Sequence, residues 1–401
     1  MRLCDPLTPE DMMVQSCPEA SPAKWHLAHT TWFFESFVLR EFLPGYRVFN
    51  ADFQWLFNSY YESFSPFPEK KLRASFSRPA LDEILAYREH VDAAMERLLE
   101  SDPAPEALRR IVLGANHEEQ HQELLLTDIM NAFFTNPLRP AYLKPETRGE
   151  GNGGTSAAQL EFLEFAGGLV QAGNAGGSFC FDSEMPRHRV WLEPFSLANR
   201  LVTCSEYWEF ITDGGYTKPE FWLSAGWATV KEQGWRAPLY WTNEGSGWHI
   251  FTLRGELPLE QIANVPVSQL SYYEADAYAH WARKRLATEF EWEIAAENQP
   301  VEGNLLDSGN LMPVPQNPAG SEDSVNCYGD CWQWTASAYL GYPGFRPLDG
   351  SLGEYNGKFM SGQMVLRGGS CVTPAAHIRS SYRNFFPPET RWQFSGIRLA
   401  S

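Results

Sequence analysis

Apolar side chains recur at three- and four-residue intervals in the first third of the chain, which is the spacing of one face of an α-helix. The first such run follows Ser21-Pro22, includes Trp25, Trp32 and Phe33, and continues to Pro44-Gly45. Serine suits the cap of a helix, and proline suits its first position. The pattern therefore predicts an N-terminal helix that Ser21 caps and that stops at Pro44-Gly45.

Two further stretches carry the same helical spacing. One covers residues 80–99, follows Ser77-Arg78-Pro79 and ends at Asp102-Pro103. The other covers residues 105–134 and stops before Asn136-Pro137. Since proline marks helix boundaries, the first third of the chain is expected to form a small all-α bundle. Such bundles build metal sites from side chains that point inward from different helices.

The pattern changes beyond residue 144. A segment rich in Gly, Asn, Thr, Ser and charge predicts an exposed linker over 145–157. Beyond it, short segments separated by Gly, Pro and Asn dominate, and clear helical spacing appears only near 203–213 and 271–285. For a chain of 401 residues, we therefore predict a helical domain over 1–144 and an irregular α+β domain over 158–401.

Composition narrows the range of partners. The chain has 50 acidic and 32 basic residues, a formal net charge of −18, which disfavours nucleic acid because its phosphates would be repelled. No apolar run approaches the roughly 18 residues of a membrane span. The first residues lack the apolar stretch of a secretory signal, and seven irregularly spaced cysteines indicate reduced thiols. We expect a cytoplasmic protein that acts on small molecules, with neither nucleic acid nor a membrane as partner.

One string within the third predicted helix carries candidate chemistry, namely His117-Glu118-Glu119-Gln120-His121. Residues four apart share a helix face, so His117 and His121 can both reach one metal ion. The string matches the HExxH signature of zinc peptidases, in which Glu118 would be the general base. It is also a histidine pair that any histidine-bound metal could use. The position of the third ligand in the sequence would distinguish these interpretations.

Candidate third ligands lie on either side of the string. His26 and His29 lie on adjacent rows of one face of the first predicted helix, and antiparallel packing of the two helices would bring one of them to the metal. Glu123 and Asp128 are possible oxygen ligands after the string, whereas the next histidine, His188, falls in the second domain. A zinc peptidase normally takes its third ligand from residues after the string, and the helical domain has no histidine there. The first helix is therefore the favoured source of the third ligand.

Longer motifs around these histidines resemble the ergothioneine-biosynthetic sulfoxide synthases. They read SPAKWHLAHTTWFFE from Ser21 to Glu35 and HEEQHQE from His117 to Glu123. The second part independently resembles the formylglycine-generating-enzyme (sulfatase-modifying factor, C-type-lectin-like) fold. The motifs that carry this likeness are Gly167-Gly168, Glu184-Met185-Pro186-Arg187-His188, Pro266-Val267, Ala287 to Glu293, Trp332-Gln333-Trp334-Thr335 and Leu366 to Ser370. An all-α DinB-like bundle followed by this α+β fold is the architecture of that family, and we expect it here.

The resemblance implies a site for iron(II). The family's ligands fall on His29, His117 and His121, and His26 becomes a neighbour of the site. Three imidazoles on one face of the ion leave positions for a substrate thiolate, a substrate imidazole and O2. The implied reaction joins the sulfur of cysteine or γ-glutamylcysteine to C2 of hercynine (Nα-trimethylhistidine) and oxidises that sulfur to a sulfoxide. The chain is therefore expected to be an oxidoreductase.

The resemblance also implies roles for side chains elsewhere in the helical domain. Tyr60 and Tyr61 resemble a branch of the family whose active-site tyrosines come from this domain. A phenol near the iron can donate a proton and favour sulfoxide formation over thiol dioxygenation. Gln120 matches a position that hydrogen-bonds the substrate imidazole. Arg73 and Arg78 are candidates to hold the carboxylate of the thiol substrate, since guanidinium groups suit carboxylates.

Three further substrate-binding candidates, Asn384, Phe385 and Phe386, lie near the end of the chain. Actinobacterial-type members of the family carry Trp-Asp where this chain has Phe385-Phe386, and that aspartate helps bind the amine of γ-glutamylcysteine. Its absence favours free cysteine as the donor. Asn384 matches a position near the hercynine carboxylate, and Phe385 could offer an aromatic face to the trimethylammonium group.

Other functions stay open at this point. An ovothiol-type synthase shares the fold and the ligands but joins unmethylated histidine at C5. Such enzymes typically carry an added methyltransferase domain, for which 401 residues leave no room. A formylglycine-generating copper oxidase needs a cysteine pair near the last strands, where Cys371 stands alone. The remaining alternatives are an HExxH-type zinc hydrolase and a non-catalytic binding protein stabilised by a metal, although structural metal sites close all their positions, commonly with cysteine.

Overall fold

The computed structural model describes residues 1–143, 157–243, 245, 247–316 and 325–401. The chain divides into two compact units. The first comprises Met1–Tyr142 and Pro347–Tyr355, and the second comprises Leu143–Arg346 and Asn356–Ser401. No feature of the sequence had indicated that 347–355 belongs with the helices. The linker predicted over 145–157 lies outside the described residues, apart from Ala157.

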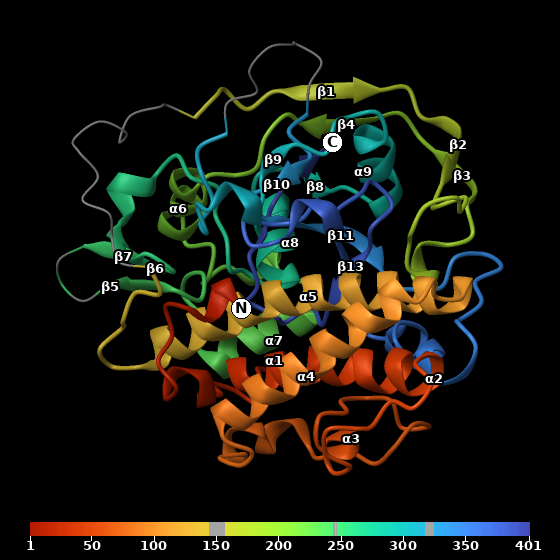
Figure 1. Cartoon of the computed structure of the whole chain (residues 1–401). Coiled ribbons are helices and arrows are strands. Elements are labelled where there is room, and N and C mark those ends of the chain that lie inside the picture. The colour runs from red at the N-terminus through yellow and green to blue at the C-terminus, as the bar shows by residue number, and fades with distance from the viewer. Residues whose placement is uncertain (144–156, 244, 246, 317–324) are drawn as a thin grey trace. The chain divides into compact units, whose positions relative to one another are not determined.

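The long helices of the first unit are α1 (Ala23–Phe34), α4 (Leu81–Glu100) and α5 (Pro105–Thr135), which confirms the predicted all-α bundle. In Figure 1, α1 runs alongside α4 and α5. The short helices are α2 (Arg40–Phe42) and α3 (Phe53–Leu56). A π-helical turn at Glu35–Leu39 joins α1 to α2, so the helical path ends close to the predicted stop at Pro44-Gly45.

The start of α1 differs from the prediction that Ser21 caps it. Pro22 occupies the N-cap position, and no side chain bonds to the first turn. The Ser21 amide instead donates to Asp128 Oδ2 at 2.8 Å, and its hydroxyl accepts from Arg73 Nη1 at 2.8 Å. Ser21 therefore ties the start of α1 to α5 and to the segment that precedes α4.

Helix α1 has no side that faces solvent, because every residue from Ala23 to Phe33 is buried. Its polar side chains must therefore find partners inside the unit. Lys24 Nζ donates to the carbonyl oxygens of Phe76 and Pro79 at 2.8 and 2.7 Å. The two histidines of α1, His26 and His29, are likewise buried.

Close packing of α5 against α1 depends on Gly114, which lies one turn before His117. A Cβ atom at this position would lie 2.7 Å from Phe34 Cε1 and 3.0 Å from Phe33 Cδ1. Glycine in a helix interior costs about 1 kcal/mol relative to alanine. Its presence here is explained by the close approach of the two helices that carry the candidate ligands.

The second unit is an α+β fold of short strands, as predicted. In its described residues, one four-stranded sheet has the order β1-β4-β15-β8 and another the order β13-β12-β11-β14. These strands are β1 (Phe162–Phe165), β4 (Phe195–Ala198), β8 (Arg285–Leu286), β11 (Trp332–Ala338), β12 (Met364–Arg367), β13 (Asn384–Phe386), β14 (Ser395–Gly396) and β15 (Leu399–Ala400). Neighbouring strands are antiparallel except β11 and β14, which are parallel.

Smaller sheets complete the described strands of this unit. Strand β2 (Gly168–Ala172) pairs antiparallel with β3 (His188–Leu192). Strand β9 (Gly303–Asn304) pairs parallel with β10 (Tyr328–Gly329). An antiparallel meander is formed by β5 (Trp241–Asn243), β6 (Trp248–Thr252) and β7 (Gly255–Pro258).

The predicted helices of this unit are confirmed as α6 (Cys204–Thr212) and α8 (Tyr272–Trp281). The expectation of only two clear helices was wrong, because α7 (Ser224–Gln233) and α9 (Glu289–Ala296) are also present. Both are short, and α7 has no side-chain cap. The start of α9 has a capping box between Thr288 and Glu291, a signal that was present in the sequence.

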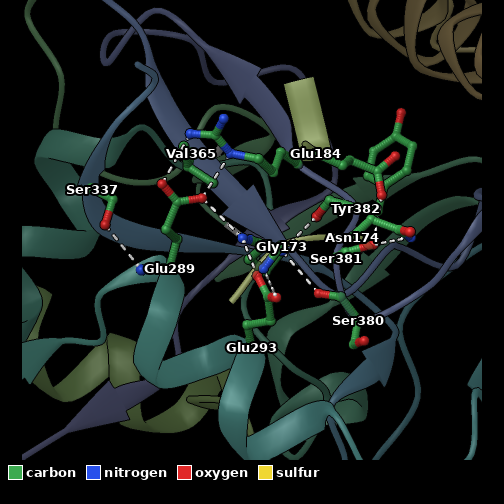
Figure 2. A network of polar contacts seen from close by, with 12 residues as sticks. Gly173, Asn174, Glu184, Glu289, Glu293, Ser337, Val365, Ser380, Ser381 and Tyr382 are labelled. Atoms are coloured by element: carbon green, nitrogen blue, oxygen red, sulfur yellow. Dashed lines mark hydrogen bonds and ion pairs between the residues drawn. The ribbon is translucent and has the colours of Figure 1, made fainter. Parts of the chain in front are cut away.

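A buried ionic network joins α9 to the sheet of β11, β12 and β13. Glu289 accepts from Arg367 Nη2 at 2.9 Å and from Arg383 Nε at 2.8 Å. Glu293 accepts from the amide of Gly173 (Figure 2). It also accepts from Arg367 Nη2 at 2.9 Å. Burial alone would raise the pKa of Glu289, but the two arginines outweigh burial and hold it below its ordinary value. Because each buried carboxylate is paired, the network holds its elements together without leaving a charge uncompensated.

The cysteines are free thiols, as the sequence predicted. Cys327, Cys331 and Cys371 are buried, and burial raises the pKa of Cys327 to about 11. Burial also raises the pKa of Cys331 well above its ordinary value, so Cys327 and Cys331 are packing groups and not reactive thiolates. No described helix is long and apolar enough to cross a membrane.

Candidate metal centre

Helices α1 and α5 bring three histidines together inside the first unit. His29 comes from α1, and His117 and His121 come from successive turns of α5. One ring nitrogen from each lies within 4.8 Å of the other two, and Nε2 of His117 is 3.1 Å from Nε2 of His121. Among the described residues, this is the one group of three or more histidine, cysteine or acidic side chains whose possible ligand atoms lie close enough together to hold one metal ion. The three residues are the ones that the family resemblance implied.

The three imidazoles are neutral at ordinary pH. Burial lowers the pKa of His117 to about 3. Burial, together with the nearby His117, holds the pKa values of His29 and His121 well below the ordinary value. A histidine must be unprotonated to bind a metal. The site therefore presents nitrogen lone pairs and not positive charges.

The orientation of His29 leaves one nitrogen without a protein partner. Its Nδ1 donates to the carbonyl oxygen of Phe57 at 2.6 Å. Its Nε2 is buried and makes no hydrogen bond within the described chain. An unsatisfied buried polar atom costs about 1–3 kcal/mol, and a metal ion bound by the three histidines would satisfy it. The residues present therefore fit a histidine-bound metal.

Of the two predicted arginines, only Arg73 is close to the cluster. It is 3% exposed and lies over the ring of Trp25, with its guanidinium carbon 3.4 Å from the ring centroid. It donates to the hydroxyls of Ser21 and Ser59 at 2.8 and 2.9 Å. No carboxylate pairs with it among the described residues, so it can still take up an anionic group. Arg78 is exposed and has no described contact with the histidines.

Tyr60 and Tyr61 lie in the loop after α3, with their hydroxyl oxygens 3.5 Å apart. Asn58 shapes this loop, because its side chain bonds to both the amide and the carbonyl of Tyr61. Tyr61 is fully buried against Trp32 and Phe37. Burial raises the pKa of both phenols, so both hold their protons at neutral pH.

The segment Pro347–Tyr355 brings a tyrosine to the site that sequence reasoning missed. The ring of Tyr355 lies 5.7 Å from that of His117 and 6.0 Å from that of Tyr60. Glu354 holds the segment in place by accepting from the amides of Glu62 and Ser63 at 3.1 and 3.0 Å. No motif marked this tyrosine, because its proximity depends on a long-range return of the chain.

Glu118 and Gln120 occupy different surroundings on α5. Glu118 accepts from Arg88 Nη2 of α4 at 2.9 Å, so it is engaged in an ion pair between helices. This pairing, together with a third histidine supplied by α1, argues against the zinc-peptidase interpretation, in which Glu118 would activate water at the metal. Gln120 is half-buried one turn from His117, and its substrate role stays a prediction.

Asn384, Phe385 and Phe386 form strand β13 of the second unit. Phe385 stacks on Tyr339 with ring centroids 4.0 Å apart and planes 12° apart. One aromatic face of Phe385 is therefore already covered within its own unit. The substrate-binding roles of the three residues stay predictions.

Comparison with known proteins agrees with this architecture. The DinB superfamily model matches residues 1–125, and the sulfatase-modifying factor enzyme 1-like domain matches residues 155–401. The hercynine oxygenase of Mycolicibacterium smegmatis is 31% identical over 96% of this chain and 91% of its own length. That of Mycobacterium tuberculosis is 30% identical over 97% of this chain and 93% of its own.

A more distant relative covers less of the sequence. Ergothioneine biosynthesis protein 1 of Schizosaccharomyces pombe is 28% identical over 55% of this chain and 27% of its own length. The near-complete matches and the two domain models agree with the resemblance found in the motifs around the histidines. The chain belongs to the hercynine oxygenase family.

Proposed function

We propose that this protein is a non-haem iron(II), O2-dependent sulfoxide synthase of ergothioneine biosynthesis, an oxidoreductase. It joins C2 of hercynine to the sulfur of cysteine or γ-glutamylcysteine and oxidises that sulfur. The observation that carries the proposal is the convergence of three neutral histidines from α1 and α5, of which His29 and His117 are buried and His121 is half-buried. The names of the two bacterial relatives support hercynine as the substrate.

His29, His117 and His121 would hold the metal. When bound, iron(II) supplies the redox chemistry that couples O2 to oxidation of the thiol sulfur, and a set of only three protein ligands leaves room for substrates. The protein contributes a largely buried cluster with its ring orientations fixed in advance. The hydrogen bond from His29 Nδ1 to the Phe57 carbonyl is one such constraint.

The surrounding side chains have proposed roles that suit their chemistry. Arg73 binds the carboxylate of the thiol substrate, because it carries a buried positive charge without an acidic partner in the described chain. Gln120 hydrogen-bonds the hercynine imidazole. Tyr60 or Tyr61 donates a proton during sulfur oxidation, and their raised pKa values keep that proton available.

Cysteine is the favoured sulfur donor. Phe385-Phe386 stands where the Trp-Asp pair of γ-glutamylcysteine users would be, so no aspartate is present there for the glutamyl amine. Asn384 is assigned to the hercynine carboxylate and Phe385 to the trimethylammonium group. Arg78 is kept as a weaker candidate for the thiol carboxylate because it is exposed. A cytoplasmic location is part of the proposal.

The proposal is tested by reconstituting the protein with Fe(II) under anaerobic conditions. O2 is then admitted with hercynine and either cysteine or γ-glutamylcysteine, and products are identified by mass spectrometry. A hercynyl sulfoxide adduct from cysteine is the expected result. An adduct formed only from γ-glutamylcysteine would overturn the donor assignment and leave the reaction intact.

The same experiment includes arms for the alternatives. Product from unmethylated histidine and cysteine, with none from hercynine, would move the assignment to the ovothiol type. The absence of any adduct in every mixture, despite bound Fe(II), would contradict the proposed reaction. Activity of the zinc-loaded protein on peptide substrates would then be the next measurement, because it would reopen the hydrolase interpretation.

A further inference from the structure

His26 lies beside the three-histidine cluster and contacts one of its members. Its Nδ1 is 2.8 Å from Nδ1 of His121, and its Nε2 is 3.1 Å from Oδ2 of Asp128. The same carboxylate oxygen accepts from the Ser21 amide at 2.8 Å. His26 is 4% exposed and Asp128 is 7% exposed. A continuous line of contacts, Asp128, His26, His121, therefore runs through the interior of the first unit and ends at the cluster.

The direction of these hydrogen bonds follows from the atoms that can only accept. A carboxylate has no proton to give, so the proton between His26 and Asp128 is on Nε2 of His26. A neutral imidazole carries one N–H, so Nδ1 of His26 accepts. Nδ1 of His121 must then donate to it. The lone pair of His121 is thereby left on Nε2, the atom that lies 3.1 Å from Nε2 of His117.

We infer that His26 and Asp128 are positioning residues for the metal, which hold His121 with its proton on Nδ1 and its Nε2 free to bind. This inference rests on the proposed three-histidine metal site. Ligating histidines commonly donate their second nitrogen to a carboxylate or a carbonyl. His29 does so directly, through Phe57, whereas His121 reaches its carboxylate through an intervening histidine.

We call the line of contacts from Asp128 through His26 to His121 the relay. It also explains why His26 and Asp128 are buried with defined partners. The Asp128 carboxylate is fixed by the Ser21 amide, and Ser21 is itself held by Arg73. The position of the carboxylate is thus set by the start of α1, the helix that carries His26 and His29. The ring of His121 is therefore oriented relative to α1 as well as by its own helix.

Removal of His26 should affect His121 before it affects the fold. In His26→Phe, the ring volume is largely retained, but Nδ1–H of His121 loses its acceptor in a buried site. We expect the affinity for Co(II), used as a spectroscopic substitute for Fe(II), to fall by about 10- to 100-fold. His26→Gln can accept from His121 through its amide oxygen and donate to Asp128 through its amide nitrogen. It should recover most of the loss.

The matched control is His90→Phe, because His90 lies on α4 and bonds to the backbone of Arg47. It should bind Co(II) as the wild type does. Affinities are measured by competition with a chromophoric chelator, and urea unfolding of the metal-free proteins separates an effect on binding from an effect on stability. Loss of affinity in His26→Phe without recovery in His26→Gln would contradict the relay.

The proton position is measured independently of any metal. Long-range 1H–15N correlation spectra of the metal-free protein report which ring nitrogen of each histidine carries the proton, and His121 is assigned by the signals missing from His121→Gln. The relay requires the proton on Nδ1 in the wild type and a shift towards Nε2 in His26→Phe. A wild-type proton on Nε2 would overturn the relay, and this result needs no variant of His26 that folds.

Failure of the relay and failure of the proposed function give different results. Wild-type protein that binds neither Co(II) nor Fe(II) would refute the metal site and the proposed reaction. The spectrum of the metal-free protein would still decide the direction of the hydrogen bonds. Conversely, unchanged Co(II) affinity in His26→Phe would overturn the positioning role and leave the metal site in place.

Discussion

The indole of Trp25 lies flat against the imidazole of His29, with ring centroids 4.4 Å apart and planes 14° apart. Trp32, one turn further along α1, also stacks on His29, at 5.4 Å and 13°. The plane of this candidate ligand is therefore set by the helix that carries it. A group whose orientation is fixed before binding loses less conformational freedom when the ligand arrives.

The stack predicts that Trp25→Leu weakens metal binding. Leucine fills part of the space but offers no flat surface, so the His29 ring gains freedom and Co(II) affinity falls several-fold. Chelator competition measures the affinity, and urea unfolding of the metal-free protein reports the accompanying loss of stability. The control is Trp55→Leu, since Trp55 is 44% exposed on the same unit. Equal affinities in the two variants would show that stacking does not orient the ligand.

Substitutions at His117 and Glu118 separate the iron and zinc-peptidase interpretations. His117→Ala removes a ligand and should abolish stoichiometric binding of Fe(II). Glu118→Gln should retain the metal and most of the activity, because Glu118 is paired with Arg88. That pair is partly exposed, so its loss should cost at most about 1 kcal/mol of unfolding free energy. If Glu118→Gln bound metal but were as inactive as His117→Ala, a catalytic glutamate would have to be reconsidered.

The tyrosines are expected to affect the product more than substrate binding. The ring of Tyr355 lies 6.0 Å from that of Tyr60 and 5.7 Å from that of His117. The ring of Tyr61 instead packs against Trp32 and Phe37. We therefore predict that Tyr60→Phe raises the ratio of cysteine sulfinate to sulfoxide adduct more than Tyr61→Phe does. Mass spectrometry of single reactions gives this ratio. Tyr142→Phe is the control, and a ratio unchanged in both active-site variants would exclude Tyr60 and Tyr61 as the proton donor.

Stability of the metal-free protein should fall as the pH is lowered from 7 to 5. The folded pKa of His117 is about 3, against 6.5 for an ordinary histidine. In that interval the unfolded chain binds more protons than the folded chain, so acid favours unfolding. Each such histidine contributes up to about 1.4 kcal/mol per pH unit. Denaturant unfolding at several pH values tests this.

The control for the pH series is His117→Phe. It removes one of the titrating groups and should reduce the slope of unfolding free energy against pH. A wild-type slope of zero between pH 7 and 5 would mean that the folded and unfolded chains bind the same number of protons, which would contradict the lowered pKa values of the three histidines.

The long helices of the first unit could be predicted because local signals agree there. Helical spacing, proline boundaries and sufficient length all point to α4 and α5. The strand-rich unit was predicted only as a class. Helix α7 was missed because it buries only Gly226 and Val230, and α9 was missed because six of its eight residues are buried, so neither shows one apolar face opposite a polar one. The capping box at Thr288 would have revealed α9.

Prediction of the site had a different limit. The pair His117 and His121 follows from helix geometry, but the choice of His29 over His26 came from family resemblance. In the structure, the difference between them is the direction of two rings on one buried helix, which spacing alone does not determine. The arrival of Tyr355 beside His117 depends on contacts between residues more than two hundred positions apart, for which the sequence has no local signal.

The burial of α1 on all sides has a consequence for how this protein can vary. On α4, the buried residues recur with the helical repeat (Ile84, Tyr87, Val91, Ala94 and Leu98), so a saturation scan should alternate between tolerant and intolerant positions. Along α1, tolerance should be low at every residue from Ala23 to Phe33. Most substitutions there would lower the abundance of the protein in cells by destabilising it, even where His29 itself is untouched.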